Sequence, residues 1–261
     1  MSAPISDVSR VQMEFLRPHE IQAVLDHTST VYIALGSIEW HCEHLPVGLD
    51  ALTAHGVCLR AALDSGGLVY PPLYFSTGGG HSDYPSTVMM DDETEIRALL
   101  EHLLRRLELF GVAKAVLFSG HFAPGQLDMI ANIAAAWNAS HVQMTVVARG
   151  INMAKGLAIA PDHAGIFETT MLYALWPDRV DLDRLPALDA AHPRTGSTEL
   201  RPGSGTRAAG RRCTLASHTM RPLYAARTSR FQALTIRLSL PAPLPHDVSE
   251  PELLQQKRQH S

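Results

Sequence analysis

Residues 39–50, which read EWHCEHLPVGLD, contain two carboxylates and an imidazole whose spacing could serve a metal, at Glu39, Asp50 and His41. Glu39 and His41 come directly after an apolar run, and side chains two residues apart in an extended chain point the same way. Asp50 is predicted to begin the next helix, where the helix N-terminus favours a carboxylate. These residue types can hold one divalent cation or share two, so we predict a metal site here.

Further candidate ligands follow in two later segments. His121 comes directly after the apolar run 114–119, and Glu168 lies near the start of a helix predicted over 166–176. Such ligands converge, because the sites of open parallel sheets gather beyond the carboxyl ends of the strands. Nitrogen and oxygen ligands together suit Zn²⁺, Mn²⁺ or Fe²⁺ rather than Ca²⁺, and two such ions commonly share a bridging carboxylate. We therefore predict one site built from Glu39, His41, Asp50, His121 and Glu168.

An alternation of strands and helices must position these residues. Short apolar runs predict strands, the second of which contains prolines and is expected to be irregular or at a sheet edge. The expected strands are 31–37, 68–75, 114–119 and 143–148, and the expected helices are 50–63, 91–110, 127–137 and 166–176. This order predicts an α/β protein with a largely parallel sheet and crossover helices.

The C-terminal part of the chain has a different composition. Residues 177–210 are rich in Pro, Gly, Arg and Asp and are expected to form a long loop. Residues 231–240 alternate between apolar and polar types and predict an edge strand. We expect one α/β domain over residues 1–240, followed by a Pro-rich, polar tail over 241–261.

Composition narrows the class of protein further. The 261 residues carry a formal net charge of −4 without a basic stripe, so nucleic acid is not an expected partner. No apolar run reaches the ~18 residues that a membrane-spanning helix needs, so no membrane partner is expected either. The N-terminus lacks the pattern of a signal peptide, and the cysteine count of three is odd. These features predict reduced thiols in a cytoplasmic protein.

At its polar segments the chain resembles the creatininase family. The family signature Glu-x-His-Gly-x-His-Leu-Pro-x-x-x-Asp corresponds here to EWHCEHLPVGLD, and the family's Asn-Gly-His-Gly-Gly-Asn turn corresponds to SGHFAP. Its His-Ala-Gly-x-x-Glu-Thr-Ser element corresponds to HAGIFETT, and GHSDYPST is similar to its Pro-Gly-Thr loop. The matches keep the family's order and spacing over roughly residues 30–176.

The resemblance implies a fold and a metal arrangement. The implied fold has three α/β/α layers around a mainly parallel central sheet, and the implied assembly is a homo-oligomer, often a hexamer. Two divalent ions (Zn, Mn or Fe) are implied. Glu39 and His121 would bind one ion, His41 would bind the other, and Asp50 would bridge them.

The resemblance also implies roles outside the first motif. Ala123 stands where creatininase has a further metal-binding glutamate, so Glu168 is the candidate that completes the second metal site. His163 matches the residue to which proton transfer is assigned, and Asp162 lies beside it. We therefore predict that His163 and Asp162 are catalytic.

Several neighbouring residues are candidates for supporting roles. Phe122 replaces a family glycine and is expected to place a ring near the metals and the substrate. Ser82, like its neighbour His81, can touch substrate from a Gly-rich turn. His44 either orients a metal ligand or is structural, and Cys42, which replaces another glycine, is expected to be a small buried residue.

Together these features predict a metal-dependent amidohydrolase. The expected reaction is hydrolysis of an amide C–N bond in a small molecule, such as a lactam or a formamide, by a hydroxide that bridges the two metals. Three alternatives stay open. They are peptidase-like cleavage of a biosynthetic precursor peptide, a metal-assisted cyclisation without hydrolysis, and a metal-binding subunit without turnover.

Overall fold

A parallel sheet forms the centre of the protein in a computed structural model that describes residues 8–84 and 86–185. Its strands run in the order β2–β1–β3–β4, and every neighbouring pair is parallel. The strands are β1 (Thr30–Leu35), β2 (Leu68–Leu73), β3 (Lys114–Ser119) and β4 (Thr145–Gly150). Since the central pair is β1 and β3, the segments that follow these two strands leave the sheet side by side.

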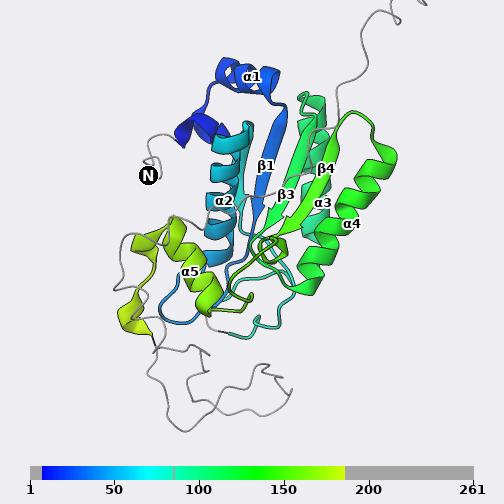
Figure 1. Ribbon diagram of the computed structural model, residues 1–261. Helices are drawn as coiled ribbons and strands as arrows, with labels where there is room; N and C mark the ends of the chain where they lie inside the picture. Colours follow the sequence, from blue (N-terminus) through cyan, green and yellow to red (C-terminus); the bar gives the residue numbers. More distant parts are fainter. Residues whose placement is uncertain (1–7, 85, 186–261) are drawn as a thin grey trace, which may run out of the picture.

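Five α-helices accompany the sheet in the described residues. They are α1 (Pro18–His27), α2 (Leu49–Ser65), α3 (Thr94–Leu109), α4 (Pro124–Ser140) and α5 (Ile166–Leu175). Short 3-10 helices occur at Ser9–Val11, Met13–Phe15, Ile151–Met153, Pro177–Arg179 and Leu182–Arg184. In Figure 1, α1 lies near the amino ends of the strands, whereas α5 lies near their carboxyl ends.

The helices cover both faces of the sheet and give it three layers (Figure 1). Alternate side chains of β1 serve the two faces, as the pleat of a strand requires. Val31, Ile33 and Leu35 pack in a core with apolar side chains of α3 and α4. Tyr32 and Ala34 pack in a second core with α2 and α5. The predicted α/β fold with a mainly parallel sheet is therefore confirmed.

The boundaries of the elements differ from the expected ones by a few residues. The strand predicted over 114–119 is found at those residues, and β2 lies at a sheet edge as its prolines predicted. Helix α3 begins at Thr94 instead of residue 91, because the Asp92 carboxylate accepts the Thr94 N–H at 2.7 Å and so precedes the helix. Helix α1 was not predicted.

Two glycines let the first turn of α2 pack against the ends of the central strands. A Cβ at Gly36 would lie 2.1 Å from the Ala51 nitrogen, and a Cβ at Gly120 would lie 2.0 Å from the Asp50 carbonyl oxygen. Gly120 also donates its N–H to the Leu35 carbonyl at 2.8 Å. This close approach places Asp50 between the ends of β1 and β3.

Several predictions fall outside the described residues. The edge strand expected over 231–240, the tail over 241–261 and most of the long loop lie there, so the proposed domain boundaries stay predictions. None of the helices in residues 8–84 and 86–185 is long and apolar enough to cross a membrane.

Candidate metal centre

The five predicted ligands meet beyond the carboxyl ends of β1 and β3. Their ligand atoms form two groups, in each of which all atoms lie within 4.8 Å of one another, and a third such group joins Glu39 and His41 to His163. We call Glu39, Asp50 and His121 the Glu39 cluster, and His41, Asp50 and Glu168 the Glu168 cluster. Each of these five residues is at most 5% exposed.

The Glu39 cluster is held together by hydrogen bonds from its own neighbours. His121 Nδ1 lies 3.0 Å from Glu39 Oε2 and 3.1 Å from Asp50 Oδ2. The Ser37 hydroxyl lies against Asp50 Oδ2 and is 3.2 Å from Glu39 Oε2. His81 Nδ1 reaches the other oxygen of Glu39, Oε1. Both Glu39 oxygens and Asp50 Oδ2 therefore have a partner in the protein, whereas His121 Nε2 has none among the described atoms.

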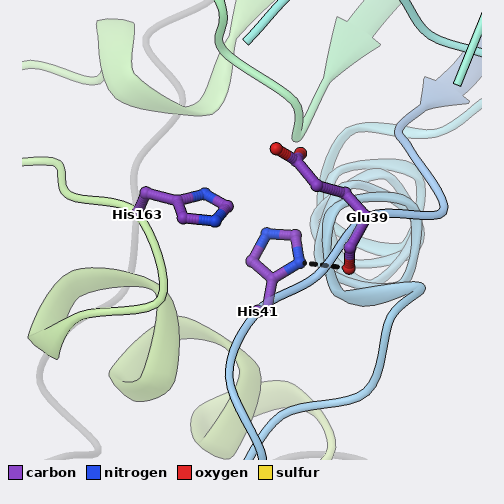
Figure 2. A group of neighbouring side chains, drawn as sticks. All are labelled: Glu39, His41 and His163. Atoms are coloured by element: carbon purple, nitrogen blue, oxygen red, sulfur yellow. Dashed lines mark hydrogen bonds between the residues drawn. The ribbon is translucent and has the colours of Figure 1, made fainter. Parts of the chain in front are cut away.

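The Glu168 cluster contains a nitrogen without a partner. His41 Nδ1–H donates to the Glu39 carbonyl oxygen at 2.9 Å (Figure 2), so Nε2 is the ring nitrogen that would bind a cation once its proton is released. Nε2 lies 3.3 Å from Asp50 Oδ1 and 3.7 Å from Glu168 Oε2, and among the described atoms it has no hydrogen-bond partner. Glu168 Oε2 also accepts the Ala164 N–H. A buried imidazole nitrogen that faces two carboxylate oxygens is a feature of a cation site.

Asp50 belongs to both clusters through different oxygens. Its Oδ1 faces His41 and its Oδ2 faces His121. The carboxylate lies in the first turn of α2, where the helix dipole stabilises negative charge. Its pKa lies well below the usual range, because the charge of His41 and the hydrogen bond from His121 outweigh the opposing effect of burial. This arrangement is the one that a carboxylate bridging two ions requires.

The pKa values of the other four candidate ligands are also shifted strongly. Burial opposes ionisation of Glu39, but hydrogen bonds from His121 and His81 lower its pKa to about 2. Burial also opposes charge on His41 and His121, yet the neighbouring carboxylates raise the pKa of each to about 10. Burial raises the pKa of Glu168 to about 8 in spite of the nearby charge of His41. Without a cation, the positive charges of protonated His41 and His121 compensate the negative charges of the carboxylates.

His163 lies at the exposed side of these clusters. Its Nε2–H donates to the Trp40 carbonyl at 2.9 Å, so Nδ1 carries the lone pair. Its ring packs between those of His41 and His81, with centroid distances of 4.6 and 4.1 Å. Figure 2 shows the rings of His163 and His41 facing one another beside Glu39. Desolvation of the ring and the charge of His41 lower its pKa to about 4, so His163 is a neutral base at pH 7.

Asp162 and His44 both form hydrogen bonds with residues of helix α5. The Asp162 carboxylate accepts the N–H groups of Phe167 at 3.3 Å and Glu168 at 3.5 Å, and so caps the helix. Its pKa is raised by burial. His44 Nε2 lies 3.0 Å from the Thr169 hydroxyl, beside Glu168. The predicted catalytic role of Asp162 stays a prediction, and His44 contacts the neighbour of a candidate ligand rather than the ligand itself.

The two predicted substrate contacts lie in different surroundings. Ser82 is exposed in the turn that follows Gly80. Phe122 is half-buried and packs edge-on against Phe167, with ring centroids 6.3 Å apart, so its ring contributes to the core beside α5. Contact of either residue with substrate stays a prediction.

Ser37 and His81 are site residues that the sequence interpretation did not assign. Ser37 lies two residues before Glu39, and the alternation that aligned Glu39 with His41 also places Ser37 on the same side. The spacing of Ser37 from Glu39 is therefore a sequence signal for its place in the site. His81 was considered only as a substrate contact, and its approach to Glu39 depends on the path of a loop that no local pattern predicts.

Cys42 adopts a backbone conformation that explains the glycine of the family signature. Its φ is +63°, in the left-handed region that glycine enters without steric cost. The residue is buried, as expected. Of the thiols, Cys58 is free and buried, whereas Cys42 is disulfide-bonded, so the prediction of reduced thiols is wrong for Cys42.

A family model and two relatives agree on the family to which this chain is similar. The family model Creatininase, described as creatinine amidohydrolase, matches residues 14–223. The creatinine amidohydrolase of Pseudomonas putida is 27% identical over 176 residues, which cover 59% of this chain and 66% of that protein. The mycofactocin precursor peptide peptidase of Mycobacterium ulcerans (strain Agy99) is 29% identical over 172 residues, covering 62% and 64%. Each alignment spans slightly less than two thirds of the relative's length.

Solved structures of creatininase share the fold. A manganese form superposes with a TM-score of 0.61 at 25% identity, covering 73% of this chain and 80% of that one. A variant creatininase of zinc–zinc type superposes with a TM-score of 0.58 at 25% identity, covering 74% and 83%.

Proposed function

The chain belongs to the creatininase family, and on this premise we propose that it is a metal-dependent amidohydrolase. The proposed reaction is hydrolysis of a C–N bond in a small molecule, such as a lactam or a formamide. The observation that carries the proposal is the buried Nε2 of His41, which has no described hydrogen-bond partner and faces two carboxylates. A buried polar atom without a partner is costly unless a ligand satisfies it.

The donor set fits two divalent cations. Glu39, Asp50 and His121 would hold one ion, and His41, Asp50 and Glu168 would hold the other. Imidazole and carboxylate ligands suit zinc, manganese or ferrous iron. Related structures named as manganese and zinc–zinc forms of creatininase support the first two of these metals. When bound, such ions lower the pKa of a water molecule, so that hydroxide is available near neutral pH, and they polarise a carbonyl group.

The chain's own residues have three tasks in this reaction. The Glu39 carbonyl fixes the tautomer of His41 by accepting its Nδ1–H. The Trp40 carbonyl does the same for His163 by accepting Nε2–H. His163 Nδ1 is then a base at the exposed side of the site. It is placed to take up a proton as the carbonyl is attacked and to deliver it to the leaving nitrogen.

One observation favours a second candidate substrate. A relative named as a mycofactocin precursor peptide peptidase is 29% identical to this chain, so a peptide bond is a candidate target. Phe122 and Ala123 stand where the family turn has glycines. Side chains at these two positions restrict the close approach of a substrate backbone that glycines allow, so we favour a small substrate over a peptide.

Turnover of lactams, formamides and short peptides in heavy-oxygen water tests the proposal. Hydrolysis places solvent oxygen in the product carboxylate, whereas a cyclising dehydration does not. We expect turnover that a chelator abolishes and that added zinc or manganese restores. Turnover that persists after complete removal of metal would contradict the proposal.

A homo-oligomer located in the cytoplasm completes the proposed description. An apolar hollow of about 560 Å³ between α3 and the edge strand β2 supports association with another subunit. Leu109 at its border is 76% exposed. Light scattering coupled to size-exclusion chromatography measures the assembly directly, and a monomer over the working concentration range would contradict it.

A further inference from the structure

His81 connects two parts of the candidate centre that belong to different motifs. Its Nδ1 reaches Glu39 Oε1, and its ring stacks on His163 at a centroid distance of 4.1 Å and an interplanar angle of 21°. Tyr84 meets the ring of His81 edge-on at 5.2 Å. We propose that His81 is a positioning residue, which holds the Glu39 carboxylate in the orientation that binds metal. This inference rests on the proposed metal-dependent function.

The contact with Glu39 uses the carboxylate oxygen that does not contact His121. His81 Nδ1–H donates to Oε1, whereas Oε2 faces His121 Nδ1 at 3.0 Å. With Oε1 occupied, the carboxylate cannot rotate without losing this bond, so Oε2 stays directed at His121 and Asp50. Partners of this kind orient metal ligands in many proteins and are outside the ligand set itself.

The backbone around Glu39 fixes the loop that carries His81. Val88 donates its N–H to the Ile38 carbonyl at 2.7 Å, and Trp40 donates its N–H to the Thr87 hydroxyl at 3.0 Å. Both chain neighbours of Glu39 are therefore attached to the loop. The approach of His81 to Glu39 is therefore fixed by backbone hydrogen bonds of the fold, and does not depend on the side chain alone.

The start of the same loop is attached to the interior and lies against the ligands. The buried Gln126 side chain accepts the Thr77 N–H at 3.2 Å. A Cβ at Gly79 would lie 3.1 Å from His121 Cε1 and 3.5 Å from Glu39 Oε1, and its φ is +93°. Glycine at this position lets the backbone approach the site closely enough for His81 to reach Glu39.

Two substitutions separate the hydrogen bond from the ring stack. His81→Asn retains an N–H donor at the position of Nδ1 but lacks the ring. His81→Phe retains a ring against His163 and Tyr84 but lacks the donor. His27→Phe, at an exposed position in the last turn of α1, is the matched control for replacing a histidine by phenylalanine. Circular dichroism of the metal-free proteins verifies that each variant is folded.

The measurement is zinc affinity of the metal-stripped proteins, by competition with a chromophoric chelator. We expect His81→Phe to weaken one zinc equivalent about 10–100-fold, as loss of a partner that orients a ligand does elsewhere. The other equivalent, the Asn variant and the control are expected to stay near the wild type.

Two results would overturn the inference while leaving the proposed function intact. One is wild-type affinity in His81→Phe. The other is an equal loss in His81→Asn and His81→Phe, because the imidazole itself would then be required and not its N–H donor. A wild-type protein that binds no zinc at all would instead overturn the proposed function, and the inference with it.

Discussion

The Glu39 and Glu168 clusters share Asp50 but compensate their charges in different ways. In the Glu39 cluster, hydrogen bonds from His121 and His81 hold the pKa of Glu39 near 2, and Ser37 supports both carboxylates. In the Glu168 cluster, the carboxyl pKa is raised to about 8 and His41 Nε2 has no described hydrogen-bond partner. Each cluster contains an imidazole nitrogen without a described hydrogen-bond partner, His121 Nε2 in the first and His41 Nε2 in the second, so the clusters differ in the pKa of their carboxyl groups.

The largest expected effect is catalytic and lies at His163, which packs against the Glu168 cluster. His163→Ala should lower kcat about 10²–10⁴-fold, the range for loss of a general acid–base group. Metal content should stay at the wild-type value, because the other five side chains form both clusters without it. Elemental mass spectrometry measures the metal alongside the kinetics. Loss of metal in this variant would mean that His163 is a ligand and not the proton carrier.

The next effect separates the two clusters by metal affinity. Glu168→Gln should weaken one equivalent at least about 100-fold, since it removes a candidate ligand and not only a supporting partner. The equivalent held by the Glu39 cluster should remain. Calorimetric titration resolves the two equivalents, and Glu95→Gln on the exposed side of α3 is the matched control. Equal loss of both equivalents would show that the clusters are not independent.

The two clusters should also respond differently to pH. Ligands must be deprotonated to bind metal, so raised pKa values make affinity rise with pH and fall on acidification. The Glu168 cluster must release protons from both His41 and Glu168, whose pKa values are about 10 and about 8. The Glu39 cluster releases one, from His121, because Glu39 is already ionised above about 2.

Below pH 8 the expected change in affinity is therefore about 100-fold per pH unit for the Glu168 cluster and about tenfold for the Glu39 cluster. Zinc affinities measured between pH 6 and 8 provide both slopes. Equal slopes would contradict the predicted difference in proton release between the two clusters.

The smallest expected effect is at Ser37, which contacts the residue that the clusters share. Ser37→Ala removes the hydroxyl from Asp50 Oδ2 and Glu39 Oε2. Both zinc equivalents should weaken by about tenfold, the lower end of the range for a partner that orients ligands. Ser37→Thr retains the hydroxyl and is expected to bind close to the wild type. A change confined to one equivalent would contradict a role through Asp50.

Much of the fold was predictable because its central strands, β1 and β3, are buried on both faces. Continuous apolar runs identified β1, β2, β3 and β4, and the alternation with helices predicted their parallel arrangement. Helix α4 was expected from residue 127 but begins at Pro124, which suits the first helical position because it lacks an N–H.

The candidate site was predictable where its residues follow strands. Glu39, His41 and His121 come directly after β1 and β3, so strand order was enough to bring them together. The contact of His81 with Glu39 was not predictable, because it depends on how residues 76–90 return to the segment that follows β1. A Gly-rich turn has no periodicity from which such a path can be derived.

The content of metal per chain in the wild type and in Asp50→Ala tests the central claim most directly. Both proteins are purified without chelator, beside the exposed control Asp128→Ala, and analysed by elemental mass spectrometry. The account predicts about two equivalents of zinc, manganese or iron in the wild type and the control, because the two clusters each hold one ion. It predicts almost none in Asp50→Ala, since Asp50 faces both clusters. Two full equivalents in Asp50→Ala, or none in the wild type after metals are added back, would contradict it.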